Sequence, residues 1–285
     1  MRSKTLKQQN DDPRIQDHWK VSSLKSLLSQ SQPEGVVIVS YADDEGIRLN
    51  KGRPGAKDGP KRILFYLGRF VYQGSRTPKI FILKDKLKSS SLAKRHEEAE
   101  AKMKALLKKG YRVITLGGGH DYGYPDAAAY AEIIRGSILN MDAHLDVRPV
   151  IQNKFNSGTP FYRFVEKFGG YTLIEWGIQD QCNSIAHKEY AKNKGVRIYD
   201  EESPCPSISG LVGLSVCLDA FQGIRGVSAP VMTGLSIREG LKAAKALSPR
   251  SHWMGIYECA PKYDPLHEDS ARLGANFAYR FIHPI

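Results

Sequence analysis

The sequence predicts an α/β fold in which helices cover both faces of one mostly parallel sheet. Short, β-branched apolar runs alternate with longer amphipathic segments, and no Pro- or Gly-rich linker interrupts the alternation. The 285 residues are 41% hydrophobic and 25% charged, a composition that excludes wholesale disorder. We therefore expect a single domain over residues 14–285, preceded by a polar, disordered tail over residues 1–13.

Eight segments have the composition of strands that are buried on both faces. Most are continuous and apolar rather than alternating, which is typical of parallel strands between two layers of helices. In chain order they are residues 36–41, 79–83, 112–116, 137–141, 171–176, 196–199, 213–218 and 253–257. We therefore expect a sheet of eight strands.

Seven further segments have apolar residues at the three- and four-residue spacing of a helix face. They are residues 59–70, 90–107, 126–135, 160–168, 185–194, 236–246 and 267–281. In the clearest of them, His96 is the one polar member of the apolar stripe, and Gly110 follows as a C-cap. In sheets that alternate with helices in this way, sites lie beyond the carboxyl ends of the strands.

Charge and cysteine usage restrict the partners that we expect. The net charge is +12, but the basic residues are spread along the chain and do not alternate with aromatic ones, so we expect no nucleic-acid partner. No run approaches the roughly 18 apolar residues of a membrane helix, so we expect no membrane partner. Because the N-terminal segment lacks the core of a secretory signal and the four cysteines form no CxxC pair, we expect free thiols and a cytoplasmic location.

Potential metal ligands follow four of the predicted strands. They are His120, Asp142, His144, Asp146, Cys217, Asp219 and Glu258. The sharpest motif is DAHLD at residues 142–146, because alternation along an extended backbone places its three polar side chains on one side. Carboxylates and imidazoles that converge at one rim of a sheet predict a site for a divalent cation of the manganese type.

These motifs resemble those of the ureohydrolase superfamily, which comprises arginase, agmatinase and formimidoylglutamase. GGGHD at residues 117–121, DAHLD and the strand with Cys217 carry the resemblance, which covers residues 36–281. It implies an arginase-like, eight-stranded α/β/α domain with two Mn²⁺ at the strand ends. By this resemblance, one ion is held by His120, Asp142, Asp146 and Cys217, and the other by Asp142, His144, Cys217 and Asp219.

Three segments look most similar to formimidoylglutamase, namely residues 146–149, 156–161 and 177–179. That similarity implies hydrolysis of N-formimidoyl-L-glutamate to L-glutamate and formamide, a step in histidine degradation, by attack of metal-activated hydroxide. Asp146 or Asp219 is expected to pass a proton to the leaving amine. The resemblance assigns Glu258 to the amidine of the substrate.

Cations are also needed for the two carboxylates of such a substrate. Arg148 and Arg163 are the nearest candidates in the sequence, although each is as easily a surface ion pair. Ser157 stands where arginases and agmatinases have a histidine, which fits a substrate other than arginine.

Cys217 departs from the superfamily, which mostly has a bridging aspartate at this position. A thiolate is softer than the oxygen ligands that Mn²⁺ prefers. This leaves three alternatives: a site that prefers zinc or iron, a weaker site, or an empty site. The alternatives to formimidoylglutamase are therefore an agmatinase- or arginase-like hydrolase and a metal-poor pseudoenzyme with a binding role. By analogy with the superfamily, we expect a homo-oligomer.

Overall fold

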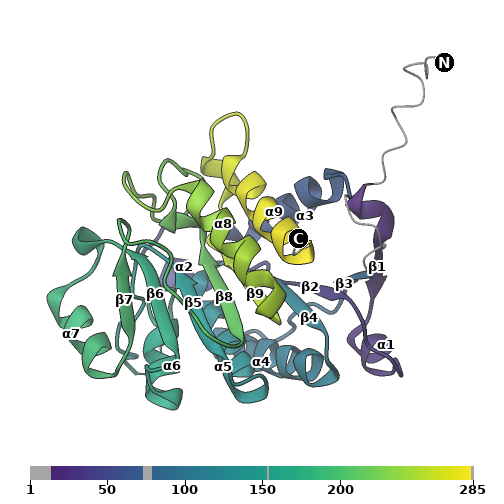
Figure 1. Ribbon diagram of the computed structural model, residues 1–285, viewed down its shortest axis with the longest axis horizontal. Helices are drawn as coiled ribbons and strands as arrows, with labels where there is room; N and C mark the ends of the chain where they lie inside the picture. Colours follow the sequence, from purple (N-terminus) through teal and green to yellow (C-terminus); the bar gives the residue numbers. More distant parts are fainter. Residues whose placement is uncertain (1–13, 73–78, 153, 284–285) are drawn as a thin grey trace.

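The computed structural model describes residues 14–72, 79–152 and 154–283, so the predicted tail over residues 1–13 lies outside the described residues. Its strands are β1 (Trp19–Ser22), β2 (Val36–Ser40), β3 (Ile80–Leu83), β4 (Arg112–Leu116), β5 (Ser137–Met141), β6 (Leu173–Ile178), β7 (Arg197–Asp200), β8 (Val212–Cys217) and β9 (Trp253–Tyr257). They form one nine-stranded sheet in the order β1-β3-β2-β4-β9-β8-β5-β6-β7 (Figure 1). All neighbouring strands pair in parallel, so the predicted fold class is confirmed with one strand more than expected.

The additional strand is β1, which lies at one edge of the sheet and pairs with β3. The side chain of Val21 is 69% exposed, and the flanking residues Lys20 and Ser22 are polar. A short edge strand that faces solvent lacks the continuous apolar run of a central parallel strand. The prediction of eight strands missed β1 for this reason.

The helices are α1 (Leu24–Leu28), α2 (Glu45–Leu49), α3 (Gly59–Arg69), α4 (Leu92–Lys109), α5 (Gly123–Ile133), α6 (Pro160–Phe168), α7 (Ile185–Asn193), α8 (Ile237–Leu247) and α9 (Asp269–Ile282). All seven predicted helices are present, and Gly110 caps α4 with a left-handed φ of 97°. The short helices α1 and α2 were not predicted. Within the described ranges, no helix combines the length and the hydropathy needed to cross a bilayer.

Helices α3, α8 and α9 cover one face of the sheet, and α4, α5 and α6 cover the other (Figure 1). Alternate residues of β2 show this division: Val36 and Ile38 join the core on the α3 side, whereas Val37 and Val39 join the core on the α4 side. A parallel strand between two helical layers is therefore apolar at every position.

The strand order brings the predicted ligands together. Strands β4, β9, β8 and β5 are consecutive neighbours in the sheet. Because they are parallel, their carboxyl ends lie at the same edge. The four segments that follow or end these strands are those in which the sequence predicted metal ligands.

Candidate metal centre

The glycine segment after β4 places His120 at the carboxyl edge of the sheet. A side chain at Gly118 would overlap the backbone of Asp43, so glycine is required for this close approach. The ring of His120 stacks on Tyr257, with centroids 4.8 Å apart, and its Nε2 lies 2.9 Å from Ser215 Oγ on β8. With Nε2 occupied by a hydroxyl, the free ligand atom of His120 is Nδ1.

The DAHLD segment after β5 is fixed by its own backbone and by Asn183. The Asp142 carboxylate accepts a hydrogen bond from His144 N at 2.8 Å. Asn183 Oδ1 accepts one from Leu145 N, also at 2.8 Å. Asp146 has a left-handed φ of 50°, which is uncommon for a residue with a side chain. These contacts hold three potential ligands on a bent segment, not on the extended backbone that the alternating pattern predicted.

Strand β8 ends at Cys217, and Asp219 follows in a short 3₁₀ turn. Glu258 follows β9 with a left-handed φ of 68°. Its carboxylate accepts hydrogen bonds from His120 N at 2.8 Å and from Ser228 Oγ. The Glu258 side chain is therefore oriented by two donors, and strained backbone of this kind is common at functional sites.

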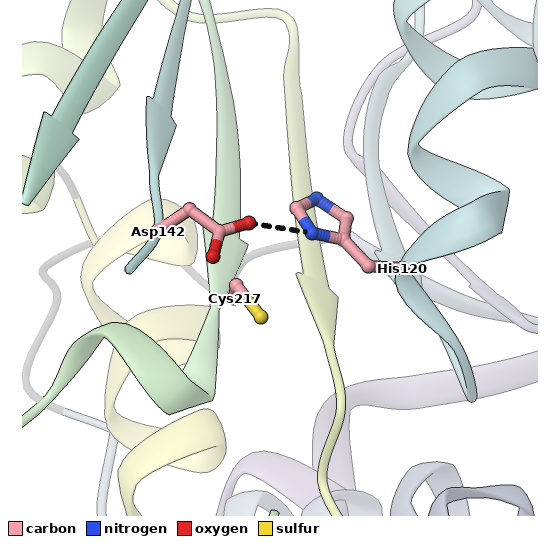
Figure 2. A group of neighbouring side chains, drawn as sticks. All are labelled: His120, Asp142 and Cys217. Carbon is pink, nitrogen blue, oxygen red and sulfur yellow. Dashed lines mark ion pairs between the residues drawn. The ribbon is translucent and has the colours of Figure 1, made fainter. Parts of the chain in front are cut away.

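The potential ligands form two groups of three that share Asp142. In the first group, ligand atoms of His120, Asp142 and Cys217 all lie within 4.8 Å of one another, and Figure 2 shows the Asp142 carboxylate and the His120 ring facing each other. In the second group, Asp142 is joined by His144 and Asp219 within the same limit. His120 Nδ1 lies 2.8 Å from Asp142 Oδ2, and His144 Nδ1 lies 3.4 Å from Asp219 Oδ2.

Asp146 lies beside the first group, with its Oδ2 at 3.2 Å from His120 Nδ1. Burial and repulsion from Asp142 raise the pKa of the Asp146 carboxyl to about 6. Burial alone would lower the pKa of His120, but hydrogen bonds and charge from Asp142 and Asp146 outweigh it and raise the pKa well above its usual value. Burial would likewise lower the pKa of His144, but charge and hydrogen bonds from Asp219 and Asp142 outweigh it and raise this pKa. Both nitrogen ligands therefore lie in a strongly negative potential.

This arrangement fits bound cations. Asp219 Oδ1 is buried and makes no hydrogen bond to any described residue, and His120 Nδ1 is buried against the carboxylates of Asp142 and Asp146. An unpaired polar atom is costly in an apolar interior unless a ligand or ion satisfies it. A negative potential, an unsatisfied ligand atom and two groups of N, O and S donors are the properties of a site for two divalent cations.

A second layer of polar residues supports these ligands from inside the sheet. Asn140 pairs with Glu175 of β6 on one side and with Ser215 of β8 on the other. Asn140 Nδ2 donates to Glu175 Oε2 at 2.8 Å, and both side chains are fully buried. Burial, together with repulsion from Asp142, raises the pKa of Glu175 well above its usual value. The prediction from sequence missed this layer, although polar residues inside otherwise apolar strands were the signal for it.

A cavity of about 300 Å³ opens onto the metal ligands, a size at the lower end for small-molecule sites. Besides the ligands, its lining includes Asn50, Arg53, Arg148, Ser157, Cys182, Asn183, His187, Ser228 and Glu258. Arg148 Nη1 donates to Asn50 Oδ1 at 2.8 Å, and Asn50 Nδ2 donates to Ser157 Oγ at 3.0 Å. The structure therefore brings Arg148, Ser157 and Glu258 to the same cavity.

Arg163, the other predicted substrate contact, is not among the described residues that line this cavity. Its guanidinium lies between the rings of Tyr124 and Phe155, 3.6 and 3.8 Å from their centroids. Arg163 Nη1 donates to His96 Nδ1 at 2.9 Å, and His96 Nε2 donates to Asp121 Oδ2 at 2.8 Å. These contacts engage the Arg163 guanidinium within the protein and explain the polar member of the α4 stripe.

Comparisons with known proteins agree with this architecture. The family model for the arginase family matches residues 34–283. A formimidoylglutamase of Fusobacterium nucleatum is 31% identical over 300 residues, covering 94% of this chain and 92% of the relative. One from Staphylococcus aureus is 28% identical over 302 residues, covering 95% and 94%. A structure of Trypanosoma cruzi formiminoglutamase with Mn²⁺ aligns with a TM-score of 0.82 and 25% identity, covering 96% of this chain and 98% of that one.

The chain belongs to the arginase family. The predicted resemblance is therefore confirmed, and so is the predicted enzyme class, a metal-dependent hydrolase of carbon–nitrogen bonds in linear amidines. The individual roles predicted for the site residues stay predictions.

Proposed function

We propose that this protein hydrolyses N-formimidoyl-L-glutamate to L-glutamate and formamide. The observation that carries the proposal is the convergence of two ligand groups, Glu258 and Arg148 on one cavity. The similar proteins from F. nucleatum and S. aureus are named formimidoylglutamases, which favours this substrate over arginine or agmatine.

We propose that two divalent cations, Mn²⁺ in the T. cruzi structure, are held by the two groups that share Asp142. When bound, such a pair supplies hydroxide at neutral pH by lowering the pKa of water. Asp146, which lies against the first group, is also near enough to serve there as a ligand.

The remaining steps are assigned to side chains of this protein. Glu258 orients the amidinium of the substrate through a charge-assisted hydrogen bond, with the formimidoyl carbon facing the metal ligands. The carbon–nitrogen bond to glutamate breaks after water has added to that carbon. Asp146 or Asp219 accepts the proton of the water and passes it to the leaving nitrogen, which departs as the amine of glutamate. Arg148 holds a substrate carboxylate, and Asn50 holds Arg148 in position.

The test compares formimidoylglutamate, arginine and agmatine as substrates of the metal-loaded protein. We expect release of glutamate and formamide from the first, and little or no product from the other two. An Arg148→Met variant should raise KM for formimidoylglutamate by about 10- to 100-fold with a smaller change in kcat, because it removes a charge-assisted contact far from the reacting carbon. Faster hydrolysis of arginine or agmatine would contradict the proposal.

A cytoplasmic location, a homo-oligomeric assembly and the absence of nucleic-acid and membrane partners stay predictions from the sequence.

A further inference from the structure

The sulfur of Cys217 distinguishes the two ligand groups. The first group offers an imidazole nitrogen, a carboxylate oxygen and this sulfur, whereas the second offers one imidazole nitrogen and two carboxylate oxygens. The groups share Asp142 and each contains one histidine, so they differ in a single donor. Cys217 is only 1% exposed, and its Sγ lies within 4.8 Å of ligand atoms of His120 and Asp142 (Figure 2).

A second observation shows that this sulfur is more than apolar packing. His120 Nδ1 is buried and is directed into the same group, where it lies 2.8 Å from Asp142 Oδ2. Its other ring nitrogen already contacts Ser215 Oγ at 2.9 Å, which fixes the direction of Nδ1. A buried imidazole nitrogen, a carboxylate and a sulfur within 4.8 Å of one another are a donor set for a cation.

Ligand softness decides which cation each group prefers. Cysteine sulfur favours zinc and other borderline or soft ions, whereas carboxylate oxygen suits Mn²⁺. A carboxylate at position 217 would give both groups the same donor types. With Cys217, only the second group consists of nitrogen and oxygen alone.

We propose that Cys217 binds a divalent cation as a thiolate and thereby makes the metal centre asymmetric. The His120–Asp142–Cys217 position takes a borderline ion such as Zn²⁺, Co²⁺ or Fe²⁺, and the Asp142–His144–Asp219 position takes a harder ion such as Mn²⁺. On binding, the S–H bond of Cys217 breaks, a sulfur–metal bond forms and the proton passes to solvent. The inference rests on the proposed function only in that both concern the same metal centre.

Cobalt titration of the chelator-stripped protein tests the thiolate directly. We expect an intense near-ultraviolet band, due to charge transfer from sulfur to Co²⁺, that saturates at one Co²⁺ per chain. The band should disappear in Cys217→Asp and in Cys217→Ser. It should persist in Cys182→Ser, a matched control, because Cys182 is the other cysteine in the lining of the cavity. Its absence from the wild-type protein, or its loss only in Cys182→Ser, would overturn the inference.

Competition between Zn²⁺ and Mn²⁺ provides a second readout. Zn²⁺ binds most nitrogen and oxygen sites more tightly than Mn²⁺, so the informative quantity is the ratio of the two dissociation constants in wild type and Cys217→Asp. We expect the preference for Zn²⁺ over Mn²⁺ to fall by at least about tenfold in the variant. Changes in residues that support metal ligands alter metal affinity by about 10- to 100-fold, and the expected minimum is the lower end of that range. An unchanged ratio in a folded variant would contradict the inference.

Formamide release measured on the same samples separates this inference from the proposed function. Hydrolysis of formimidoylglutamate by a wild-type protein without the cobalt band would overturn the asymmetric centre and leave the proposed function standing. A cobalt band and a changed ratio in a protein that releases no formamide with any metal combination would support the asymmetric centre and contradict the proposed function.

Discussion

Asp142 offers one carboxylate oxygen to each of the two histidines of the metal centre. Its Oδ2 lies 2.8 Å from His120 Nδ1, and its Oδ1 lies 3.5 Å from His144 Nδ1. Burial would raise the pKa of Asp142, but hydrogen bonds and charge from His120 and His144 outweigh it and lower the pKa. The side chain is therefore ionised at neutral pH and is the one ligand common to both groups.

Replacement of Asp142 with asparagine should affect both metal positions at once. We expect bound metal to fall at both positions and hydrolysis to fall by more than about 100-fold, because a change in a ligand should exceed the 10- to 100-fold effects of residues behind ligands. Elemental analysis and formamide release measure the two effects. Asp180→Asn serves as the control, since the Asp180 side chain is 89% exposed. Two ions per chain in the Asp142 variant would contradict this role.

At the scale of elements, strands β5 and β6 support the metal centre through the pair Asn140 and Glu175. Burial and nearby carboxylates raise the pKa of Glu175 well above its usual value and favour its neutral form, which has the same charge as glutamine. We expect Glu175→Gln to stay within about 1 kcal/mol of the wild-type free energy of unfolding at pH 7. Glu175→Ala should lose about 2–5 kcal/mol, because it leaves a cavity and an unpaired Asn140. Denaturant titration measures the free energy of unfolding of both variants, and an equal loss in both would indicate that the buried Glu175 is charged in the wild-type protein.

The loop after β5 is held by Asn183, which lies just before α7 in the β6–α7 connection. Its amide donates to Ala143 O and accepts from Leu145 N, both at 2.8 Å. Asn183→Ala should weaken metal binding by about 10- to 100-fold, with a loss of only about 1–2 kcal/mol in stability. Metal-titration calorimetry measures the affinity, with the exposed Asn193→Ala on α7 for comparison. Wild-type affinity in Asn183→Ala would show that the loop needs no such support.

The sequence predicted the elements that obey a simple period and missed those set by tertiary contacts. Interior strands such as β2 are apolar at nearly every position, and this local property can be recognised in the sequence. The edge strand β1 depends on pairing with β3 and has no such pattern. Arg163 was predicted as a substrate contact from its position in the chain alone. Its partner His96 is 67 residues away, a separation that no local pattern encodes.

At the scale of the whole molecule, buried acids make the stability depend on pH. Asp126 accepts hydrogen bonds from Tyr41 at 2.9 Å and from Tyr257 at 2.6 Å. Its complete burial nevertheless raises its pKa from 3.8 to about 7. The native state therefore binds this proton more tightly than the unfolded chain. The resulting stabilisation is full below about pH 4 and is lost as the pH rises through about 7.

An Asp126→Asn variant should lack this pH dependence. We expect the wild-type protein, stripped of metal, to lose about 1–4 kcal/mol more stability than the variant between pH 4 and pH 8. Denaturant titration at several pH values provides the comparison, and only the change with pH matters, since the substitution has its own constant cost. A difference between the two proteins that stays the same at every pH would show that Asp126 is ionised throughout.

The central claim is that this fold holds a metal centre that hydrolyses formimidoylglutamate. The most direct measurement is formamide and glutamate release by the protein, first stripped with chelator and then reconstituted with Mn²⁺ alone or with one equivalent of Zn²⁺ before Mn²⁺. We predict no turnover in the stripped protein, and equal amounts of both products after reconstitution. Two ions bound per chain with no formamide released under either condition would contradict the claim.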